Sequence, residues 1–294
     1  TKLKLQGDPP SVFGMVMLPL FLPLFLLVVV SLVQRSTSHG LPRAFAIPPT
    51  PSNIITQTIS YTCLGLHYEG YAAIPKTPVP LARPGVLIGH TWTGLGRMEQ
   101  YRAAQIASKL GVVAFALDVY GTGIRPPNQT AAKVEMDKVL ANVTRFHQLL
   151  QCGMEQLKAT TAPNGATVNT SSLFANGYCF GGVMVLELAR RGTPHLQAVA
   201  SFHGELANLT NQDTDKITAV VQVHHADLDF QGPTALLQFE DEMRSRNVTH
   251  WTTTKYGSVS HGWTDPTSAN YRPFEAQQAH NNMFALYAQV LEMR

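Results

Sequence analysis

The chain has 294 residues, and 45% of them are hydrophobic, which is enough for a sizeable buried core. This composition excludes a disordered chain, a collagen-like repeat and a bare disulfide scaffold. Lysine and arginine total 22 against 19 acidic residues, and this formal net charge of +3 is too weak and scattered for a phosphate-tracking surface, so we expect no nucleic-acid partner.

An uncharged apolar run, Val12–Val33, follows a short polar stretch that contains Lys2 and Lys4. A positive flank before an apolar run is typical of a secretory signal, and this run approaches the length needed to span a bilayer. We therefore expect residues 1–40 to hold a cleaved signal peptide or a retained anchor plus the start of a linker. Any membrane contact would occur only through this run, if it stays uncleaved.

Five Asn-x-Ser/Thr acceptor sites lie outside the apolar run, at Asn128, Asn142, Asn169, Asn208 and Asn247. Such sites carry N-linked glycans in proteins that enter the secretory pathway. The two features together predict a glycoprotein that is either secreted or anchored to a membrane, with its folded domain on the luminal or extracellular side.

Strand and helix signals alternate along residues 41–294, which we expect to form one domain. Strand composition or buried apolar runs are found at Ile54–Leu66, Tyr71–Ile74, Gly85–Gly89, Val112–Leu117, Ser172–Asn176, Ala198–Phe202, Ala219–His224 and His250–Lys255. Helical spacing is found at Arg97–Leu110, Ala131–Leu150, Phe180–Arg191, Thr234–Arg244 and Phe274–Leu291. This alternation predicts an α/β fold with a mostly parallel central sheet and helices on both faces.

A Gly-x-Cys-x-Gly motif lies between a predicted strand and a predicted helix, in Gly177-Tyr178-Cys179-Phe180-Gly181-Gly182. A nucleophile elbow has this form because its sharp, strained turn leaves no room for side chains at the flanking positions. The dipole at the helix N-terminus also favours a thiolate there. The alternative is a buried structural cysteine beside a glycine turn, and the strand before and helix after favour the nucleophile.

A nucleophile of this kind needs a base and an orienting acid further along the chain. His261 lies in a Gly- and Pro-bounded loop after the last predicted strand, which makes it the candidate base. His203, which also follows a strand, is the rival. Asp227 and Asp229 both lie at the carboxyl end of a buried strand, so position alone leaves either as the acid.

Over nearly all of residues 53–294 the sequence resembles the dienelactone hydrolase family. The resemblance rests on the elbow, on Leu117-Asp-Val-Tyr-Gly-Thr-Gly123 at a strand end, and on Tyr256-Gly-Ser-Val-Ser-His261-Gly-Trp-Thr. It implies an α/β-hydrolase fold over residues 41–294. It also implies that Cys179 is the nucleophile, His261 the base and Asp229 the acid. The stretch Gly204–Lys216 between two predicted strands is too short for a lipase-type lid, so we expect no large lid and a small soluble substrate.

The segment Gly89–Leu95 is similar to the oxyanion loop of that family. The resemblance implies an oxyanion hole made of the backbone N–H of Phe180 and of one from Thr91 or Trp92. Many members carry Glu beside His90 to help control the thiol's protonation, whereas this chain has Thr91 there. We therefore expect His261 alone to generate the thiolate.

The resulting hypothesis is a hydrolase that cleaves a small ester or lactone through a Cys-His-Asp triad and a thioacyl intermediate. Trp92 and Trp263 could line the substrate site or belong to the core, and Arg125 could bind a substrate carboxylate or be a solvated loop charge. No phosphate-binding loop, dinucleotide fingerprint or paired-cysteine metal motif is present in the sequence, so no cofactor or metal is implied. We expect a monomer.

Two other classes of protein remain open. One is a non-catalytic relative that binds a small molecule or a partner, and a weaker one is a thiol-dependent peptidase. Three cysteines leave one unpaired. We expect Cys63 and Cys152 to form a disulfide or to stay buried, with Cys179 as the free thiol.

Overall fold

The structure is a computed structural model that describes residues 46–77, 82–210 and 217–293. The predicted signal peptide or anchor in residues 1–40 lies outside these ranges. Within them, no helix is long and apolar enough to cross a membrane. The connection Gly204–Lys216, where a lid would be inserted, lies only partly within them.

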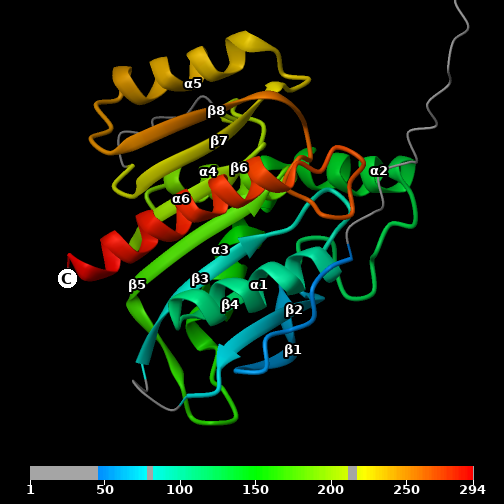
Figure 1. Cartoon of the computed structure of the whole chain (residues 1–294). Coiled ribbons are helices and arrows are strands. Elements are labelled where there is room, and N and C mark those ends of the chain that lie inside the picture. Colours follow the sequence, from blue (N-terminus) through cyan, green and yellow to red (C-terminus); the bar gives the residue numbers. More distant parts are fainter. Residues whose placement is uncertain (1–45, 78–81, 211–216, 294) are drawn as a thin grey trace, which may run out of the picture. The chain divides into compact units, whose positions relative to one another are not determined.

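Eight strands of the described residues form one sheet in the order β1-β2-β4-β3-β5-β6-β7-β8 (Figure 1). The strands are β1 (Ile54–Cys63), β2 (Leu66–Pro75), β3 (Ala82–Gly89), β4 (Val113–Ala116), β5 (Thr167–Tyr178), β6 (Leu196–Phe202), β7 (Val220–Leu228) and β8 (Trp251–Ser260). Strand β2 runs antiparallel to both of its neighbours, and all pairs from β4 to β8 are parallel. The predicted mostly parallel sheet is confirmed.

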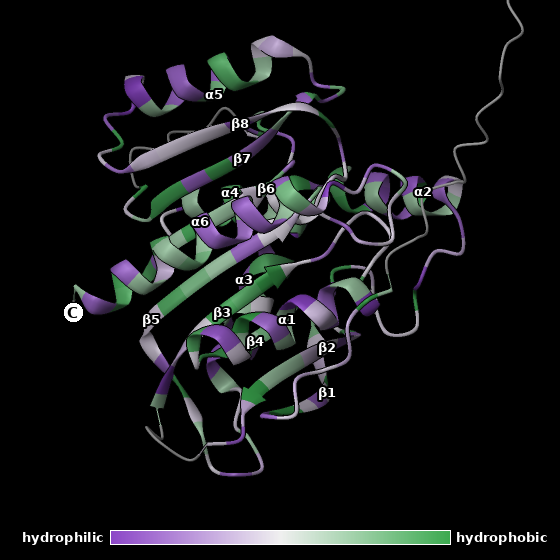
Figure 2. Ribbon diagram, in the orientation of Figure 1, coloured by the Kyte–Doolittle hydropathy of each residue, from purple (hydrophilic) through white to green (hydrophobic). Residues whose placement is uncertain are grey.

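Helices cover both faces of the sheet, and each face has its own apolar core. The helices are α1 (Arg97–Leu110), α2 (Gln129–Leu140), α3 (Val143–Ala159), α4 (Phe180–Arg190), α5 (Pro233–Ser245) and α6 (Pro273–Glu292). Helices α1 and α6 pack on one face, and α2 to α5 pack on the other. The central strands are hydrophobic along most of their length, because helices cover them on both sides (Figure 2).

Two predicted elements are each divided in the structure. The predicted strand Ile54–Leu66 ends at Cys63, because Leu64 and Gly65 adopt positive φ angles of 49° and 76° and form a hairpin turn. The predicted helix Ala131–Leu150 is two helices, α2 and α3. Asn142 caps the second helix, since its side chain accepts a hydrogen bond of 2.9 Å from the Arg145 N–H.

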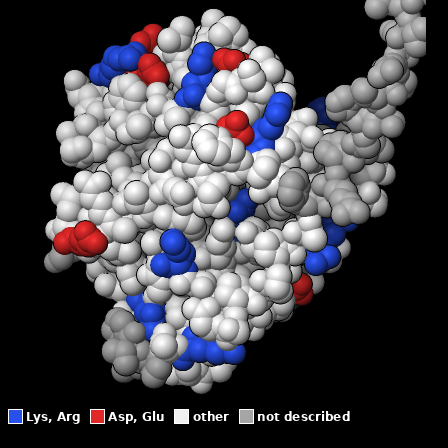
Figure 3. All heavy atoms as spheres, in the orientation of Figure 1, with Lys and Arg blue, Asp and Glu red and all other residues white. Residues whose placement is uncertain are grey.

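Charged side chains are sparse on the face of the molecule that Figure 3 shows. Lysine and arginine lie there in separate small groups between wide uncharged areas. A surface that tracks a nucleic-acid backbone needs a continuous row of cations. That face offers no such row among its described residues, and the absence of a nucleic-acid partner stays a prediction.

A disulfide joins Cys63, at the end of β1, to Cys152 in α3, with their Cα atoms 6.0 Å apart. The sequence left open whether these two cysteines form a disulfide or stay buried as thiols, and the structure shows the disulfide. It connects the antiparallel edge of the sheet to the helix layer that covers it. Cys179 is the free cysteine of the described residues.

We predict that the Cys63→Ala/Cys152→Ala double variant lowers the free energy of unfolding by about 4 kcal/mol, since the bridge closes a long loop in the unfolded chain. The 89-residue separation of the two cysteines sets that loop length. Guanidinium unfolding under non-reducing conditions checks the value. A double variant as stable as the wild type would contradict it, and Cys179→Ala is the matched control for loss of a sulfur.

Candidate active site

Cys179 occupies a strained turn between β5 and α4, with φ of 56° and ψ of −117°. Glycines flank it because backbones meet there without room for side chains. A Cβ atom at Gly177 would collide with the backbone oxygen of Gly181, and a Cβ at Gly181 would collide with that of Gly89. The strain at Cys179 is therefore imposed by close packing of β5, α4 and β3.

Backbone hydrogen bonds hold the turn in place. The Cys179 N–H donates to the Phe202 oxygen at 3.0 Å, and the Cys179 oxygen accepts from the Gly182 N–H at 2.9 Å. The thiol is half-buried, at the N-terminal end of α4. This position places the positive end of the helix dipole next to the sulfur.

His261 follows β8, and its imidazole lies between a carboxylate and the thiol. Its Nδ1 donates to Oδ2 of Asp229 at 2.9 Å, which leaves Nε2 for the hydrogen bond with Cys179. Burial acts to lower the pKa of His261, but the hydrogen bonds with Asp229 and Cys179 outweigh it and raise the pKa to about 10. The contacts with Asp229 and Cys179 thus favour the protonated imidazole at neutral pH.

Asp229, and not Asp227, is the carboxylate beside the imidazole. Burial acts to raise the pKa of Asp229, but hydrogen bonds from His261 and Gln231 outweigh it and hold the pKa below its usual value. Asp227 is exposed and forms an ion pair of 3.0 Å with Lys255. The structure thus separates two aspartates that strand position alone could not distinguish.

Gln231 is a positioning residue that the sequence analysis missed. Its backbone and side-chain N–H groups both donate to Oδ1 of Asp229, at 3.3 and 3.2 Å. The same side chain donates to the Gly204 oxygen and accepts from the Leu206 N–H. The sequence feature that could have identified Gln231 is its position two residues after Asp229, where the aspartate side chain forms an Asx turn.

Cys179 and His261 open into a cavity of about 290 Å³, here named the thiol cavity. Most of its lining is apolar, and Trp92 and Phe180 contribute to it as aromatic walls. The other residues that line it are Met136, Leu140, Val183, Glu205, Leu209 and Phe230. None of these six was predicted, because they come from α2, α4 and loops that no local motif marks.

The oxyanion loop leaves one of the two predicted donors available. The Thr91 N–H donates to Oε1 of the buried Glu99 at 3.0 Å and is therefore occupied. The N–H groups of Trp92 and Phe180 have no partner among the described residues. Tyr120 fixes the loop, since its hydroxyl donates to the Trp92 oxygen at 2.7 Å.

The structure differs from the expected substrate-binding roles of Arg125 and Trp263. Arg125 lies 3.6 Å from the buried Asp118 carboxylate and does not line the thiol cavity. Trp263 is fully buried and packs against Tyr256, with ring centroids 4.5 Å apart. The local sequence could not show that these two residues lie outside the thiol cavity, because both follow strand ends, where site residues are also found.

His203, the rival base, lies behind His261 and away from the thiol cavity. Its ring centroid is 4.9 Å from that of His261, and its Nε2 pairs with the Thr264 hydroxyl at 2.7 Å. Burial lowers its pKa well below the usual value. No cluster of histidine, cysteine and carboxylate ligands that could hold a metal ion is found in the described part of the chain.

Comparison with known proteins identifies related sequences and structures. The model of the dienelactone hydrolase family matches residues 68–291. Uncharacterized protein K02A2.1 of Caenorhabditis elegans is 34% identical over 108 residues, which are 36% of this chain and 68% of that protein.

Solved structures with the same fold cover about four-fifths of the chain. A dienelactone hydrolase-like promiscuous phosphotriesterase, P91, from metagenomic libraries has a TM-score of 0.74 at 24% identity, covering 81% of this chain and 99% of that one. A structure named m3DLH has a TM-score of 0.74 at 26% identity, with the same coverage. An esterase from Pyrobaculum calidifontis has a TM-score of 0.55 at 13% identity, covering 81% of this chain and 85% of that one.

Acidification is predicted to destabilise the protein, because buried histidines are neutral in the folded state. Burial lowers the pKa of His90, His203 and His280, and that of His224 to about 3. Below about pH 6.5 the unfolded chain binds protons at these rings and the folded protein does not. The free energy of unfolding therefore decreases as pH falls below about 6.5. The contribution of His261 has the opposite pH dependence, because the pKa of this ring is higher in the folded state than in the unfolded chain. Its protonation stabilises the fold below about pH 6.5, and this stabilisation is lost as pH rises towards 10.

For His224 alone we expect the free energy of unfolding to fall by about 2 kcal/mol between pH 7 and pH 5. Urea unfolding at pH 7, 6 and 5 measures it. In the variant His224→Gln the free energy of unfolding should depend less steeply on pH than in the wild type. An equal pH dependence in both proteins would contradict a neutral, buried His224 ring in the folded state.

Proposed function

The chain belongs to the dienelactone hydrolase family, and from that premise we propose that it hydrolyses small esters or lactones with Cys179 as the nucleophile. The observation that carries the proposal is the convergence of three side chains from the carboxyl ends of three strands. Cys179 follows β5, Asp229 follows β7 and His261 follows β8. The hydrogen-bonded series Asp229–His261–Cys179 ends at the wall of an apolar cavity.

In the first half of the reaction the Cys179 sulfur attacks the carbonyl carbon and forms a carbon–sulfur bond. The carbonyl electron pair moves to oxygen, where the N–H groups of Phe180 and Trp92 would donate to it. The tetrahedral intermediate then expels the alkoxide, which takes the Nε2 proton of His261 and leaves as the alcohol. Asp229 holds the imidazole with Nε2 towards the reacting atoms.

In the second half water hydrolyses the thioacyl enzyme. Neutral His261 accepts a proton from the water through Nε2 as the water oxygen attacks the thioester carbon. The new tetrahedral intermediate expels the Cys179 thiolate and releases the carboxylic acid. Sulfur and imidazolium then form the resting pair again, so ester and water give acid and alcohol with no other reactant.

We also propose that the protein passes through the secretory pathway. The Cys63–Cys152 disulfide supports this, since such bonds persist mainly in oxidising compartments. Asn128, Asn142 and Asn169 are exposed, as is Asn247, so glycans there would not disturb the core. The signal or anchor that this requires remains a proposal.

The proposed function predicts that Cys179→Ala abolishes hydrolysis of short aryl esters while the fold is retained. Replacing the orienting acid, in Asp229→Asn, should lower kcat about 10²- to 10⁴-fold, because the imidazole loses its fixed orientation and the charge that stabilises the imidazolium. Initial rates of phenol release measure both effects.

The matched control is Asp227→Asn, two residues away on the same strand end, which removes a carboxylate from the Lys255 pair and not from His261. It should keep nearly full activity. Undiminished turnover in Cys179→Ala would refute the role of Cys179 as the nucleophile. A wild-type protein that binds esters without hydrolysing them would favour a non-catalytic binding function.

The pKa of His261, raised to about 10, predicts the alkaline limit of activity. Because the imidazolium must give a proton to the leaving alkoxide, the acylation rate should fall as pH rises through about 10. Asp229→Asn should move this limit to lower pH, and Asp227→Asn should leave it in place. Stopped-flow acylation rates, corrected for background in Cys179→Ala, check this, and a wild-type limit near pH 7 would disprove it.

A further inference from the structure

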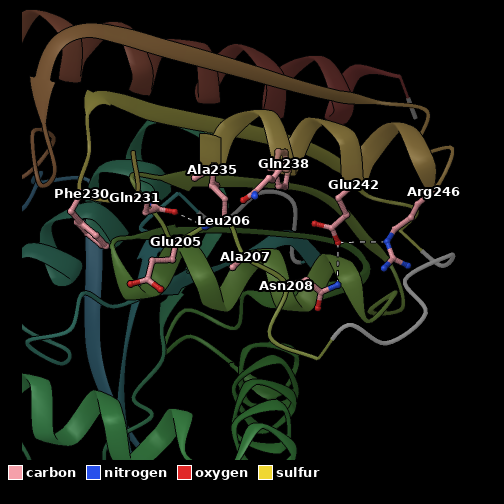
Figure 4. Close-up of a pocket in the computed structure, with 11 residues that line it drawn as sticks. Glu205, Leu206, Ala207, Asn208, Phe230, Gln231, Ala235, Gln238, Glu242 and Arg246 are labelled. Carbon is pink, nitrogen blue, oxygen red and sulfur yellow. Dashed lines mark hydrogen bonds and ion pairs between the residues drawn. The ribbon is translucent and has the colours of Figure 1, made fainter. Parts of the chain in front are cut away.

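A second cavity of about 550 Å³ lies beside the thiol cavity, between α5 and the segment 205–208 (Figure 4). We name it the α5 cavity. Its walls are more polar than those of the thiol cavity, with the side chains of Gln231, Gln238, Glu242 and Arg246 along one side. Of the residues that line it, Gln231 also donates to Asp229, and Glu205 and Phe230 also line the thiol cavity.

Glu205 and Phe230 line both cavities, so they form the junction between them. Figure 4 shows the two side chains together at one end of the α5 cavity, with Arg246 at the other end. Both are exposed, so neither is fixed by burial in the core. A substrate that extends beyond the thiol cavity therefore has a way out past these two residues.

The chemistry indicates which part of an ester would take this path. His261 delivers its proton to the leaving oxygen, so the leaving group must lie on the His261 side of the carbonyl. The ring of Phe230 lies on that side, with its centroid 4.9 Å from that of His261. In that orientation the leaving group would point past Phe230 towards the α5 cavity, and the acyl group would occupy the apolar thiol cavity.

Glu205 supplies the net charge at the junction. Among the described residues its carboxylate has no ion-pair or hydrogen-bond partner. Glu242, the other carboxylate of the α5 cavity, is neutralised by Arg190 at 2.7 Å and Arg246 at 3.7 Å. It also accepts a hydrogen bond from Asn208. Among the residues that the structure describes, Glu205 is therefore the carboxylate at the junction that no cation pairs with.

We propose that Glu205 is a specificity-determining residue that selects esters with a cationic leaving group and disfavours anionic ones. The inference rests on the proposed hydrolase function and names its substrate class. A cation that leaves the thiol cavity past Phe230 meets the Glu205 carboxylate, whereas a carboxylate or phosphate is repelled by it. Because Glu205 is exposed, solvent screens the attraction, and the preference is moderate.

The test compares two esters of equal shape, 4-(trimethylammonio)phenyl butyrate and 4-tert-butylphenyl butyrate. We expect Glu205→Gln to lower the ratio of their kcat/KM values, cationic over neutral, by about fivefold relative to the wild type. Glu205→Lys should lower it further. Phenyltrimethylammonium should inhibit the wild type competitively, and Glu205→Gln should weaken this inhibition.

The control is Asp241→Asn, which changes the same net charge on the exposed side of α5 and touches neither cavity. It should leave the ratio unchanged. An unchanged ratio in Glu205→Gln, or an equal fall in Asp241→Asn, would overturn the role of Glu205 while hydrolysis itself continues. A wild type that hydrolyses neither ester would count instead against the proposed function.

Discussion

Strands and helix approach so closely behind Cys179 that only glycine fits between them. Gly177 at the end of β5 meets Gly181 in α4, and Gly181 in turn meets Gly89 at the end of β3. A second contact of the same kind joins Gly182 to Gly204, where an added Cβ would lie 2.6 Å from the neighbouring Cα. These contacts fix the direction of α4 relative to the sheet, and so force the residue between β5 and α4 into its positive φ angle.

This constraint explains how the rest of the site is assembled. The sulfur is held at the carboxyl edge of the sheet, where the loops after β7 and β8 also emerge. Asp229 and His261 reach it from those loops without crossing the core. Because Gln231 ties Asp229 to the Gly204 segment, the acid of the proposed triad is also connected to the glycine contact behind α4.

The sequence allowed prediction of the sheet, of most helices, and of Cys179 and His261, because each is marked by local pattern. Strand position left both Asp227 and Asp229 as the acid, and the family resemblance selected Asp229. Arg97–Leu110 has helical spacing, and the α1 helix has the same bounds. The split of Ala131–Leu150 at Asn142 was missed because helical composition continues across it, and a cap is a single residue. Long-range pairing was the larger difficulty. The occupation of the Thr91 N–H by Glu99, the burial of Trp263 and the ion pair of Arg125 all depend on neighbours that no local motif specifies.

The central claim is that an acyl group becomes bonded to the sulfur of residue 179 during turnover. Rapid-quench mass spectrometry tests it directly, with an activated aryl ester whose fast-leaving phenolate makes breakdown of the acyl enzyme rate-limiting. The account predicts a transient mass increase equal to one acyl group, located on the peptide that contains Cys179 and removed by hydroxylamine. Complete turnover with no adduct, or an adduct on another residue that forms and decays at the rate of catalysis, would contradict it.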